Sequence, residues 1–262
     1  MLNRPELPIN TPANSQMLGD FVFELYSDES LDKRFKLFEK YIQKLGFDSA
    51  SYTLIPNIVL NGSVDISPIF LSSSLFSQSF IDQYIEDRFD HRDFTIRAIK
   101  DGHLYPMIWQ ESMHWDYLTD DEKHVLFLAK EEHGIKNGIS LPVQGDQYGM
   151  AGFSVLSSAN DHQFQYLKAE RIGILNVYAK AFNNAISSNA GAPSMFTPNL
   201  LTNKEEAVLR YVLEGKTMAD IGKSNEGISR RYAEKILLNL RKKFGGLTTH
   251  QLIAHVVRLG LL

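Results

Sequence analysis

The sequence predicts two domains: an α/β N-terminal domain, built as an α-β-α sandwich with a central, mainly antiparallel sheet, and an all-α C-terminal domain of four short helices. Three observations lead to this prediction. The length of 262 residues corresponds to one large or two ordinary domains. Residues 186–198 are rich in Ser, Asn, Gly, Ala and Pro, as a linker is. Strand patterns occur only before this segment, so we expect domains at 1–185 and 199–262, joined by a linker at 186–198.

The N-terminal part combines helical and extended patterns. Apolar residues at helical spacing predict helices at 30–45, around Phe76, Phe80 and Tyr84, and at about 92–100, 119–133 and 161–187. Short segments rich in Ser, Thr and branched or aromatic residues are typical of strands, and they read SASYTLIP, PIFLSS, GISLPVQ and MAGFSVLS. Because helices both precede and follow these strands, we expect helices on both faces of the sheet.

The composition excludes several classes of protein. Hydrophobic residues make up 44% and charged residues 22% of the chain, which is close to the globular average and argues against disorder. The absence of cysteine excludes a disulfide scaffold. No run of about 18 apolar residues occurs, and the first residues lack the pattern of a signal peptide. We therefore expect a cytoplasmic protein with no membrane partner.

The charges are distributed unevenly along the chain. The net charge is −4, which taken alone argues against a nucleic-acid partner. From residue 199 onward, however, there are eleven basic and six acidic residues, a net charge of +5, which leaves a net charge of −9 on the preceding residues. A small basic module on an acidic body suits a protein that places one domain on phosphates.

Helix caps divide residues 201–262 into four short helices. Thr202 and Glu205 form a capping box, and Gly215 ends the first helix. The later helices begin at Thr217, at Ser229 and at Thr248 or Thr249. A tight connection before the third of four short helices is the helix-turn-helix pattern, which predicts a domain that binds double-stranded DNA.

The third of these helices has two different faces. Ala233, Ile236 and Leu240 form one apolar stripe, and the basic residues lie largely away from it. The first residues of a recognition helix reach base edges in the major groove, where arginine can make two hydrogen bonds to guanine. An ordinary solvated helix face is the alternative, but the linker and the charge asymmetry favour DNA. The candidate DNA contacts are Arg230, Arg231, Lys235, Ser229, Thr217 and Lys242.

These residues resemble a known family. LTNKEEAVLRYVLEGKT, GIS and AHVVRLGLL are similar to the LuxR-type helix-turn-helix, with the motif's glutamate, leucine and glycine at Glu205, Leu209 and Gly215. The chain departs from the family pattern at Tyr232 and Ala233, where Thr-Val is usual. The resemblance implies a homodimer on a palindromic promoter site, with RNA polymerase as a further candidate partner. An apolar stripe on the last helix, at Leu252, Val256 and Leu259, also favours dimerisation.

The body of the chain resembles the acyl-homoserine lactone receptor domain of quorum-sensing regulators. In FIDQYIEDRFDHRDFTIRAIKDGHLYPMIW the family's aromatic pair falls on Phe80 and Tyr84, its Asp on Asp93, and its Pro-x-x-Trp segment ends at Trp109. HGIKNGISLPV and GFSVLS continue the pattern, and the latter places Ser154 where Ser or Thr often lines the pocket. Phe80 departs from the family, which usually has Trp there.

This set of residues suits a ligand with a flat polar head and an apolar tail. Asp93 would accept the ligand's amide N–H, Tyr84 would donate to the acyl carbonyl, and Trp109 would donate to the ring carbonyl. Each aromatic residue alone is more often core packing, and Asp93 alone is more often a helix cap. The ordered set favours a pocket, with candidate ligand contacts at Tyr84, Asp93, Trp109, Phe80, Ser154 and Phe76 and further apolar candidates at Leu54 and Met150.

The sequence also leaves room for another kind of sensor, whereas it disfavours an enzyme or a metal site. A PAS- or GAF-like sensor with the same DNA module would bind a different small molecule or act without ligand. An enzyme is disfavoured because GFSVL lacks the second glycine of a nucleophile elbow. Asp90, His91 and Asp93 are crowded, but no His-x-x-x-His pair accompanies them. We expect a regulator that senses an acyl-homoserine lactone or a similar small amphiphile, with no metal, no cofactor and no catalysis.

Overall fold

The computed structural model describes residues 12–27, 30–56, 69–74, 76–146, 149–187, 200–221, 223, 227–258 and 261–262. They form two compact units: most of the residues up to Ala185 belong to the first, and those from Ile186 on belong to the second. Most of the predicted linker, from residue 188 on, lies outside the described residues.

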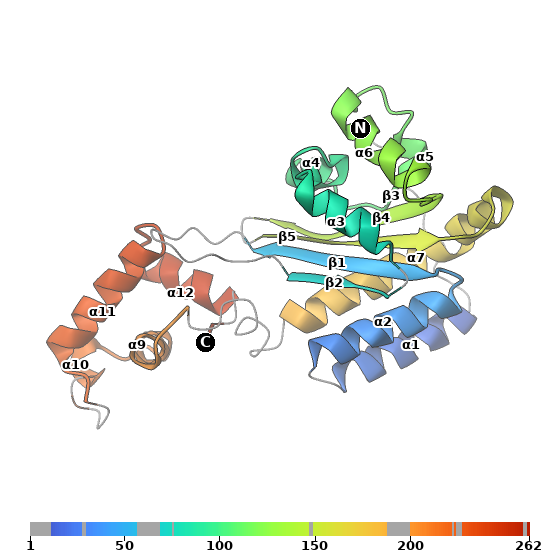
Figure 1. The fold of residues 1–262 in the computed structure, drawn as a ribbon. Helices are drawn as coiled ribbons and strands as arrows, with labels where there is room; N and C mark the ends of the chain where they lie inside the picture. The colour runs from blue at the N-terminus through green and yellow to red at the C-terminus, as the bar shows by residue number, and fades with distance from the viewer. Residues whose placement is uncertain are drawn as a thin grey trace. The chain divides into compact units, whose positions relative to one another are not determined.

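The N-terminal unit is built on a five-stranded sheet (Figure 1). Its strands are β1 (Ser49–Pro56), β2 (Ile69–Ser72), β3 (Met107–Ile108), β4 (Asn137–Asp146) and β5 (Gly149–Ser157). They lie in the order β2-β1-β5-β4-β3, and the pairs β1–β2, β3–β4 and β4–β5 are antiparallel. The predicted α/β class and the four predicted strands are confirmed. The strand β3 was not predicted, because a strand of two residues has no periodicity to detect.

Helices cover both faces of this sheet, as Figure 1 shows. One layer comprises α1 (Pro12–Tyr26), α2 (Leu31–Lys44) and α7 (Asp161–Ser187). The other comprises α3 (Gln78–Glu86), the 3-10 helix η1 (Phe89–His91), α4 (Phe94–Lys100), α5 (Trp109–Ser112) and α6 (Asp120–Glu131). The predicted helices at 30–45, 92–100, 119–133 and 161–187 are confirmed, whereas α1 and α5 were missed.

The two faces of the sheet carry different side chains. Successive residues of a strand point to opposite faces. On one face Phe153 of β5 stacks on Phe38 of α2 with ring centroids 4.2 Å apart and meets Phe182 of α7 at 5.2 Å. Tyr52 of β1 faces the same layer, where its hydroxyl donates to Asn183 of α7 at 2.8 Å. This face is therefore filled by large aromatic residues.

The opposite face of β4 and β5 carries small residues. Ser140 of β4 lies opposite Ser154 of β5, and Gly138 and Gly152 share their face by alternation. At these four positions no large side chain fills the space, so the face admits side chains from the helices above it, such as Trp109 over Gly138. The site predicted from the sequence lies on this side.

The C-terminal unit consists, in its described part, of α9 (Asn203–Leu213), α10 (Met218–Ile221), α11 (Arg230–Lys243) and α12 (Thr249–Arg258). The capping box predicted for the first of them is present, since Thr202 accepts from the Glu205 N–H at 3.3 Å and its own N–H donates to Glu205 at 2.8 Å. Ala233, Ile236 and Leu240 are buried as the apolar stripe of α11 predicts.

One expectation about the last helix is wrong. Leu252 and Val256 were expected to remain exposed and to favour dimerisation, but both are fully buried in the core of the C-terminal unit. Four short helices suffice to cover them because Val208, Leu209 and Phe244 pack into the same cluster. Leu259 lies outside the described residues. In the described ranges, no helix is long and apolar enough to cross a membrane.

Candidate ligand site and DNA-facing helix

Tyr84 and Asp93 are joined by a hydrogen bond. The Tyr84 hydroxyl, on α3, donates to Asp93 Oδ2 at 2.7 Å. Burial, with the Asp93 carboxylate beside it, raises the pKa of Tyr84 well above 10.0. The hydroxyl therefore stays protonated and remains a donor at neutral pH. The structure thus brings together two residues that are nine positions apart in the sequence.

Asp93 is also the cap of α4, which confirms the helix-cap interpretation of this residue, while its contact with a ligand stays a prediction. Its Oδ1 accepts from the Thr95 N–H and from the Thr95 hydroxyl, each at 2.7 Å. An N-cap carboxylate satisfies backbone N–H groups that have no partner inside the helix. The cap therefore fixes Oδ1 and leaves Oδ2, which faces Tyr84, as the atom with spare capacity to accept.

Trp109 lies at the start of α5 against the small-residue face of the sheet. Its indole N–H donates to the Ser140 hydroxyl at 2.9 Å. A Cβ atom on Gly138 would lie 2.3 Å from the Trp109 ring, so only glycine fits beneath the indole. Ser154 is the cross-strand neighbour of Ser140. Ser140 therefore accepts from Trp109 and has Ser154 as its partner on the neighbouring strand.

The predicted aromatic residues belong to one apolar cluster. Phe76 and Phe80 are buried in it together with residues of α6 and β5, and Tyr84 and Trp109 pack against it. The rings of Phe80 and Tyr84 meet edge to face with centroids 6.0 Å apart. Trp109 also contacts a second cluster that contains Phe94 of α4. The structure therefore gathers five of the six candidate ligand residues, Phe76, Phe80, Tyr84, Trp109 and Asp93, around one region.

Of the further apolar candidates, Leu54 does not fit. It lies two residues after Tyr52 on β1 and so shares the face that packs on α7. Met150 precedes Gly152 and Ser154 by even steps on β5 and lies on the small-residue face. The strand position of Leu54 was predicted, but the face it occupies was not.

Two polar residues of this region were missed from the sequence. Ser140 holds the indole of Trp109, and Thr95 completes the cap of Asp93. A signal existed for Thr95, because an Asp followed two positions later by Thr is typical of a capped helix start. Nothing in the sequence marks Ser140, since its role depends on which residue β3 and α5 place above it.

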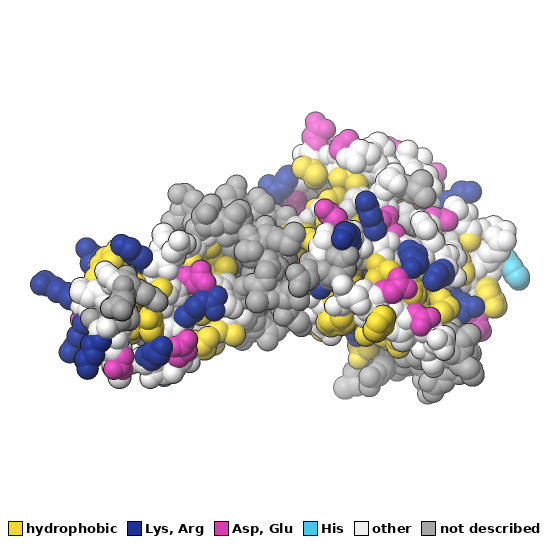
Figure 2. Space-filling view, turned by 90° about the horizontal axis from the view of Figure 1, so that it is seen from below, with side chains coloured by type: hydrophobic (Ala, Val, Ile, Leu, Met, Phe, Trp, Pro, Cys, Tyr) yellow, Lys and Arg dark blue, Asp and Glu magenta, His cyan; other side chains and the backbone are white. Residues whose placement is uncertain are grey.

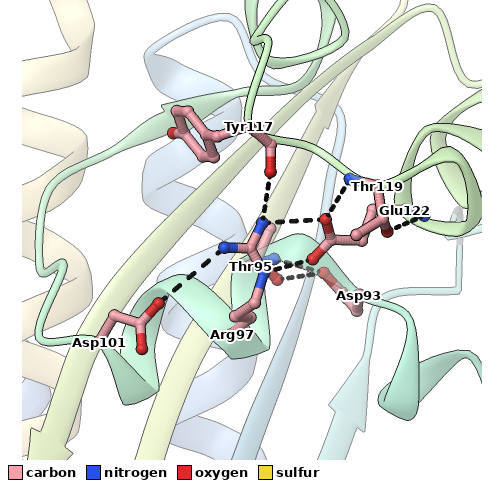
Figure 3. A network of polar contacts seen from close by, with 7 residues as sticks. All are labelled: Asp93, Thr95, Arg97, Asp101, Tyr117, Thr119 and Glu122. Carbon is pink, nitrogen blue, oxygen red and sulfur yellow. Dashed lines mark hydrogen bonds and ion pairs between the residues drawn. The ribbon is translucent and has the colours of Figure 1, made fainter.

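A polar network ties α4 to α6 beside Asp93 (Figure 3). The Arg97 guanidinium donates to both oxygens of Glu122, at 2.6 and 2.9 Å. It also donates to the Tyr117 carbonyl at 3.4 Å and lies 4.0 Å from the Asp101 carboxylate. Burial acts against the charge on Glu122, but the hydrogen bonds from Arg97 and Thr119 prevail and lower its pKa below 4.5.

Asp90 and His91 do not form a metal site. Asp90 accepts two hydrogen bonds from the Arg88 guanidinium, at 3.0 and 3.1 Å. His91 Nε2 lies 3.6 Å from Asp90 Oδ2, which also accepts from Arg88, and 2.7 Å from the same Arg88 nitrogen. Within the described ranges, no group of three or more His, Asp or Glu side chains is arranged to hold a metal ion.

In the C-terminal unit, two of the candidate DNA residues are helix caps. Ser229 accepts from the Tyr232 N–H at 3.2 Å and begins α11. Thr217 accepts from the Asp220 N–H at 3.3 Å at the start of α10. Their hydroxyls are exposed but are used within the chain, so their first role is to fix the start of each helix.

The basic candidates lie on the exposed surface of α11. Arg231, Lys235 and Lys242 are exposed, and Figure 2 shows Lys and Arg side chains gathered on this unit, at the left of the view. Arg230 is exposed too, but it donates to Glu234 at 2.9 Å. DNA would have to compete with that carboxylate for Arg230.

A groove borders this surface between the start of α9 and α11. Lys204 lines it from α9, and Tyr232, Lys235 and Asn239 line it from α11. The Lys204 ammonium lies 5.4 Å from the centre of the Tyr232 ring. The groove therefore brings a second cationic side chain close to the basic face of α11.

Comparison with known proteins identifies the N-terminal unit. The family model described as the autoinducer binding domain matches residues 30–186, which is more than half of the chain. The transcriptional activator protein AnoR of Acinetobacter nosocomialis is 25% identical over 234 residues, covering 88% of this chain and 92% of that protein.

Solved structures share the fold at low sequence identity. The crystal structure of Escherichia coli SdiA matches with a TM-score of 0.53 and 16% identity, over 94% of this chain and 98% of that one. SdiA in complex with octanoyl-rac-glycerol matches with a TM-score of 0.50 and 15% identity, over 96% and 97% of the two chains. The matched range includes Tyr84, Asp93 and Trp109. It confirms the family resemblance found in the sequence. The chain therefore belongs to the autoinducer-binding domain family.

Proposed function

We propose that the protein is a transcriptional regulator of the quorum-sensing type, in which an acyl-homoserine lactone binds the N-terminal unit and changes how the C-terminal unit binds DNA. Membership of the autoinducer-binding family supports the small-molecule ligand. AnoR, with which the chain shares 25% identity over 88% of its length, is a transcriptional activator by name. The family match does not favour a PAS- or GAF-like sensor.

The observation that supports the ligand best is the Tyr84–Asp93 pair. A carboxylate beside an aromatic cluster, already fixed on Oδ1 by the helix cap, offers Oδ2 to a donor. The amide N–H of an acyl-homoserine lactone is such a donor, and a charge-assisted bond to Asp93 is about twice as strong as a neutral one. The acyl chain would then lie among Phe76, Phe80 and their neighbours, each methylene contributing about 0.8 kcal/mol.

Two of the donors near the site already have partners inside the chain. Tyr84 donates to Asp93, and Trp109 donates to Ser140. A ligand carbonyl would therefore have to draw one of these donors away from its present partner. We expect the Trp109 N–H to turn from Ser140 to the lactone carbonyl, with the hydroxyls of Ser140 and Ser154 left to bond each other or water.

The C-terminal unit supports the second half of the proposal. Its four described helices include an exposed basic α11 that starts at a serine cap. We propose that α11 enters the major groove, with Arg231 and Lys235 at base edges and Lys242 on a phosphate. A homodimer would present two such helices to a palindromic site. A signal changes how the two helices are arranged only if it binds one arrangement of the dimer more tightly than another.

The test uses fluorescence of the full chain. Its two tryptophans are Trp109 and Trp115, and both lie in the apolar clusters next to the site. Titration with N-acyl-homoserine lactones of increasing chain length should change this fluorescence with saturation, and the bound ligand should raise the melting temperature. Asp93→Asn keeps an oxygen for the helix cap but removes the charge, so it should weaken binding by about 100-fold with little loss of fold.

DNA binding is measured on the same protein. A promoter fragment selected by the protein from a random library should be bound in a lactone-dependent way, and Arg231→Ala should reduce that binding by about tenfold or more. A chain that binds no lactone and whose DNA affinity is unaffected by any lactone would contradict the proposal.

A further inference from the structure

Two hydrogen bonds, which form a fork between Arg97 and Glu122, link α4 to α6. Arg97 Nε and one terminal nitrogen donate to the two carboxylate oxygens of Glu122, at 2.6 and 2.9 Å (Figure 3). Glu122 is only 4% exposed. Two parallel hydrogen bonds between planar groups fix relative orientation as well as distance. The fork therefore sets how α4 lies against α6.

Glu122 is itself held rigidly by its own helix. It closes the capping box of α6, in which the Thr119 N–H donates to Glu122 Oε2 at 2.9 Å and Thr119 Oγ1 accepts from the Glu122 N–H at 3.2 Å. The carboxylate thus accepts hydrogen bonds from α4 and from the start of α6 at once. Arg97 therefore binds a carboxylate whose position is fixed by the capping box of α6.

On the other side of the fork, α4 carries Asp93. The helix spans only Phe94–Lys100, and a helix of two turns has no stability of its own in water. Its place is therefore set by what holds it. Phe94 is buried in an apolar cluster, Ile99 packs on Gly145, and Arg97 grips Glu122.

Asp93 and Arg97 are one helical turn apart. The Arg97 N–H donates to the Asp93 carbonyl at 3.3 Å, so the cap residue and the arginine belong to the same first turn. A shift of Arg97 would be passed to the Asp93 carboxylate and to its bond with Tyr84. The Arg97 side chain is 42% exposed, but its two parallel hydrogen bonds to the buried Glu122 carboxylate still fix the geometry of the pair.

We infer that Arg97 is a positioning residue for the head group of the ligand, acting through Asp93 without touching the ligand itself. The inference rests on the proposed function, in which Asp93 Oδ2 receives the amide N–H. The fork holds the start of α4 at the distance from α6 at which that oxygen meets the ligand.

The first experiment compares two variants of the full chain. Arg97→Lys keeps the charge but cannot form the fork, and its affinity for N-octanoyl homoserine lactone, followed by tryptophan fluorescence, should fall by about tenfold. Asp101→Asn is the matched control, because it removes the exposed partner that lies 4.0 Å from the same guanidinium and leaves the fork intact. Its affinity should equal that of the wild type.

A double-mutant cycle separates positioning from a general loss of structure. In the Asp93→Asn background there is no charged carboxylate to place, so Arg97→Lys should cost less than about twofold in affinity. An equal loss in both backgrounds would show that Arg97 acts through overall stability, which overturns the inference. Unchanged affinity of Arg97→Lys in the wild-type background also overturns it.

A second variant covers the case in which Arg97→Lys does not fold. The pair Arg97→Gln with Glu122→Gln leaves no unpaired buried charge and retains hydrogen-bonding groups on both helices. It should fold and show the same selective loss of lactone affinity, and a wild-type affinity would count against the inference. Wild-type protein that binds neither N-octanoyl homoserine lactone nor octanoyl-rac-glycerol would instead contradict the proposed function, and the inference with it.

Discussion

Single residues make the two faces of the sheet different. Gly138 and Ser140 of β4 and Ser154 of β5 are small, and Trp109 lies directly on Gly138. The opposite face carries Phe153 and Tyr52, which are packed solidly between α2 and α7. The strand β5 thus contributes to a face of packed rings and to a face of small residues, and the two can be perturbed separately.

Replacing Gly138 by alanine should displace the Trp109 indole. The added Cβ would lie 2.3 Å from the ring, and forcing a side chain out of a packed position costs about 1–3 kcal/mol. We expect a lower urea midpoint, a shifted tryptophan emission and weaker lactone binding. Gly19→Ala is the control, because Gly19 lies within α1 with nothing within 4 Å of its Cβ position and should gain about 0.5–1 kcal/mol. A Gly138→Ala protein with wild-type emission would show that the indole does not depend on this glycine.

Glu122 should make the N-terminal unit sensitive to acid. Its pKa is lowered in the fold, so the folded state holds fewer protons than the unfolded chain, whose carboxyl titrates near 4.5. The stability that this carboxylate contributes is complete above that pH and is lost as the pH falls through the lowered value.

Glu122→Gln tests this dependence. At pH 7 the variant should be less stable than the wild type by about 1.5–3 kcal/mol, the range for hydrogen bonds to a charged group. Below pH 4.5 the difference should shrink, since the unfolded wild-type chain then binds a proton at this carboxyl, and it should level off once the pH falls below the lowered pKa of the folded state. Urea unfolding followed by tryptophan fluorescence at several pH values measures the gap, and a gap that does not change with pH would refute this role.

At the scale of elements, caps fix the starts of the helices that carry function. Ser229 begins α11, and its side chain satisfies the Tyr232 N–H. Ser229→Ala should lower the stability of the C-terminal unit by about 1 kcal/mol and weaken DNA binding, because the first turn that holds Arg231 frays. Ser229→Asn keeps a capping oxygen and should behave like the wild type. Circular dichroism at 222 nm during thermal unfolding, with DNA binding in parallel, is the measurement; equal behaviour of the alanine and asparagine variants would exclude a capping role.

Periodicity and caps predicted most elements, because these signals are local. The strand at 49–56 was predicted with the bounds that β1 has, and the cap residues Thr202 and Ser229 lie where the sequence placed them. The helix α1 was missed because its pattern is blurred: Phe21 and Leu25 are buried, whereas Phe23 between them is 77% exposed.

The parts of the site that escaped the sequence are those that depend on tertiary pairing. Asp93 was predicted both as a cap and as a candidate ligand contact, and both predictions rested on residues close to it in the sequence. Glu122 is 25 positions from Arg97, and Trp109 is 31 positions from Ser140, so their pairing follows from the packing of the helices on the sheet. The burial of Leu252 and Val256 was misjudged for the same reason, since α9 and α11 supply their cover.

At the scale of the whole molecule, the basic charge of the C-terminal part on an otherwise acidic chain should make DNA affinity depend on salt concentration. The chain is acidic overall, with a net charge of −4, but its exposed basic residues on α11 include Arg231, Lys235 and Lys242. A dimer that makes about six phosphate contacts should lose about 10³ in DNA affinity between 50 and 200 mM salt.

Variants of single lysines test which part carries this dependence. Lys242→Ala should reduce the slope of log affinity against log salt by about one per module, and it should do so for all DNA sequences alike. Lys130→Ala removes an exposed lysine of α6 in the N-terminal unit and should leave the slope unchanged. Equal slopes for the wild type and Lys242→Ala would place the phosphate contacts elsewhere.

The unlike faces of β4 and β5 also bear on how such a receptor can diversify. If the ligand binds on the small-residue face as proposed, a change at Gly152 or Ser154 should alter its contacts, while Phe153 between them should keep its stacking on Phe38 and the fold should be retained. Under this proposal, ligand selectivity and the stability of the fold depend on alternating residues of the same strand. A library randomised at every second codon of β5 should therefore yield folded receptors with new selectivities far more often than one randomised at the codons between.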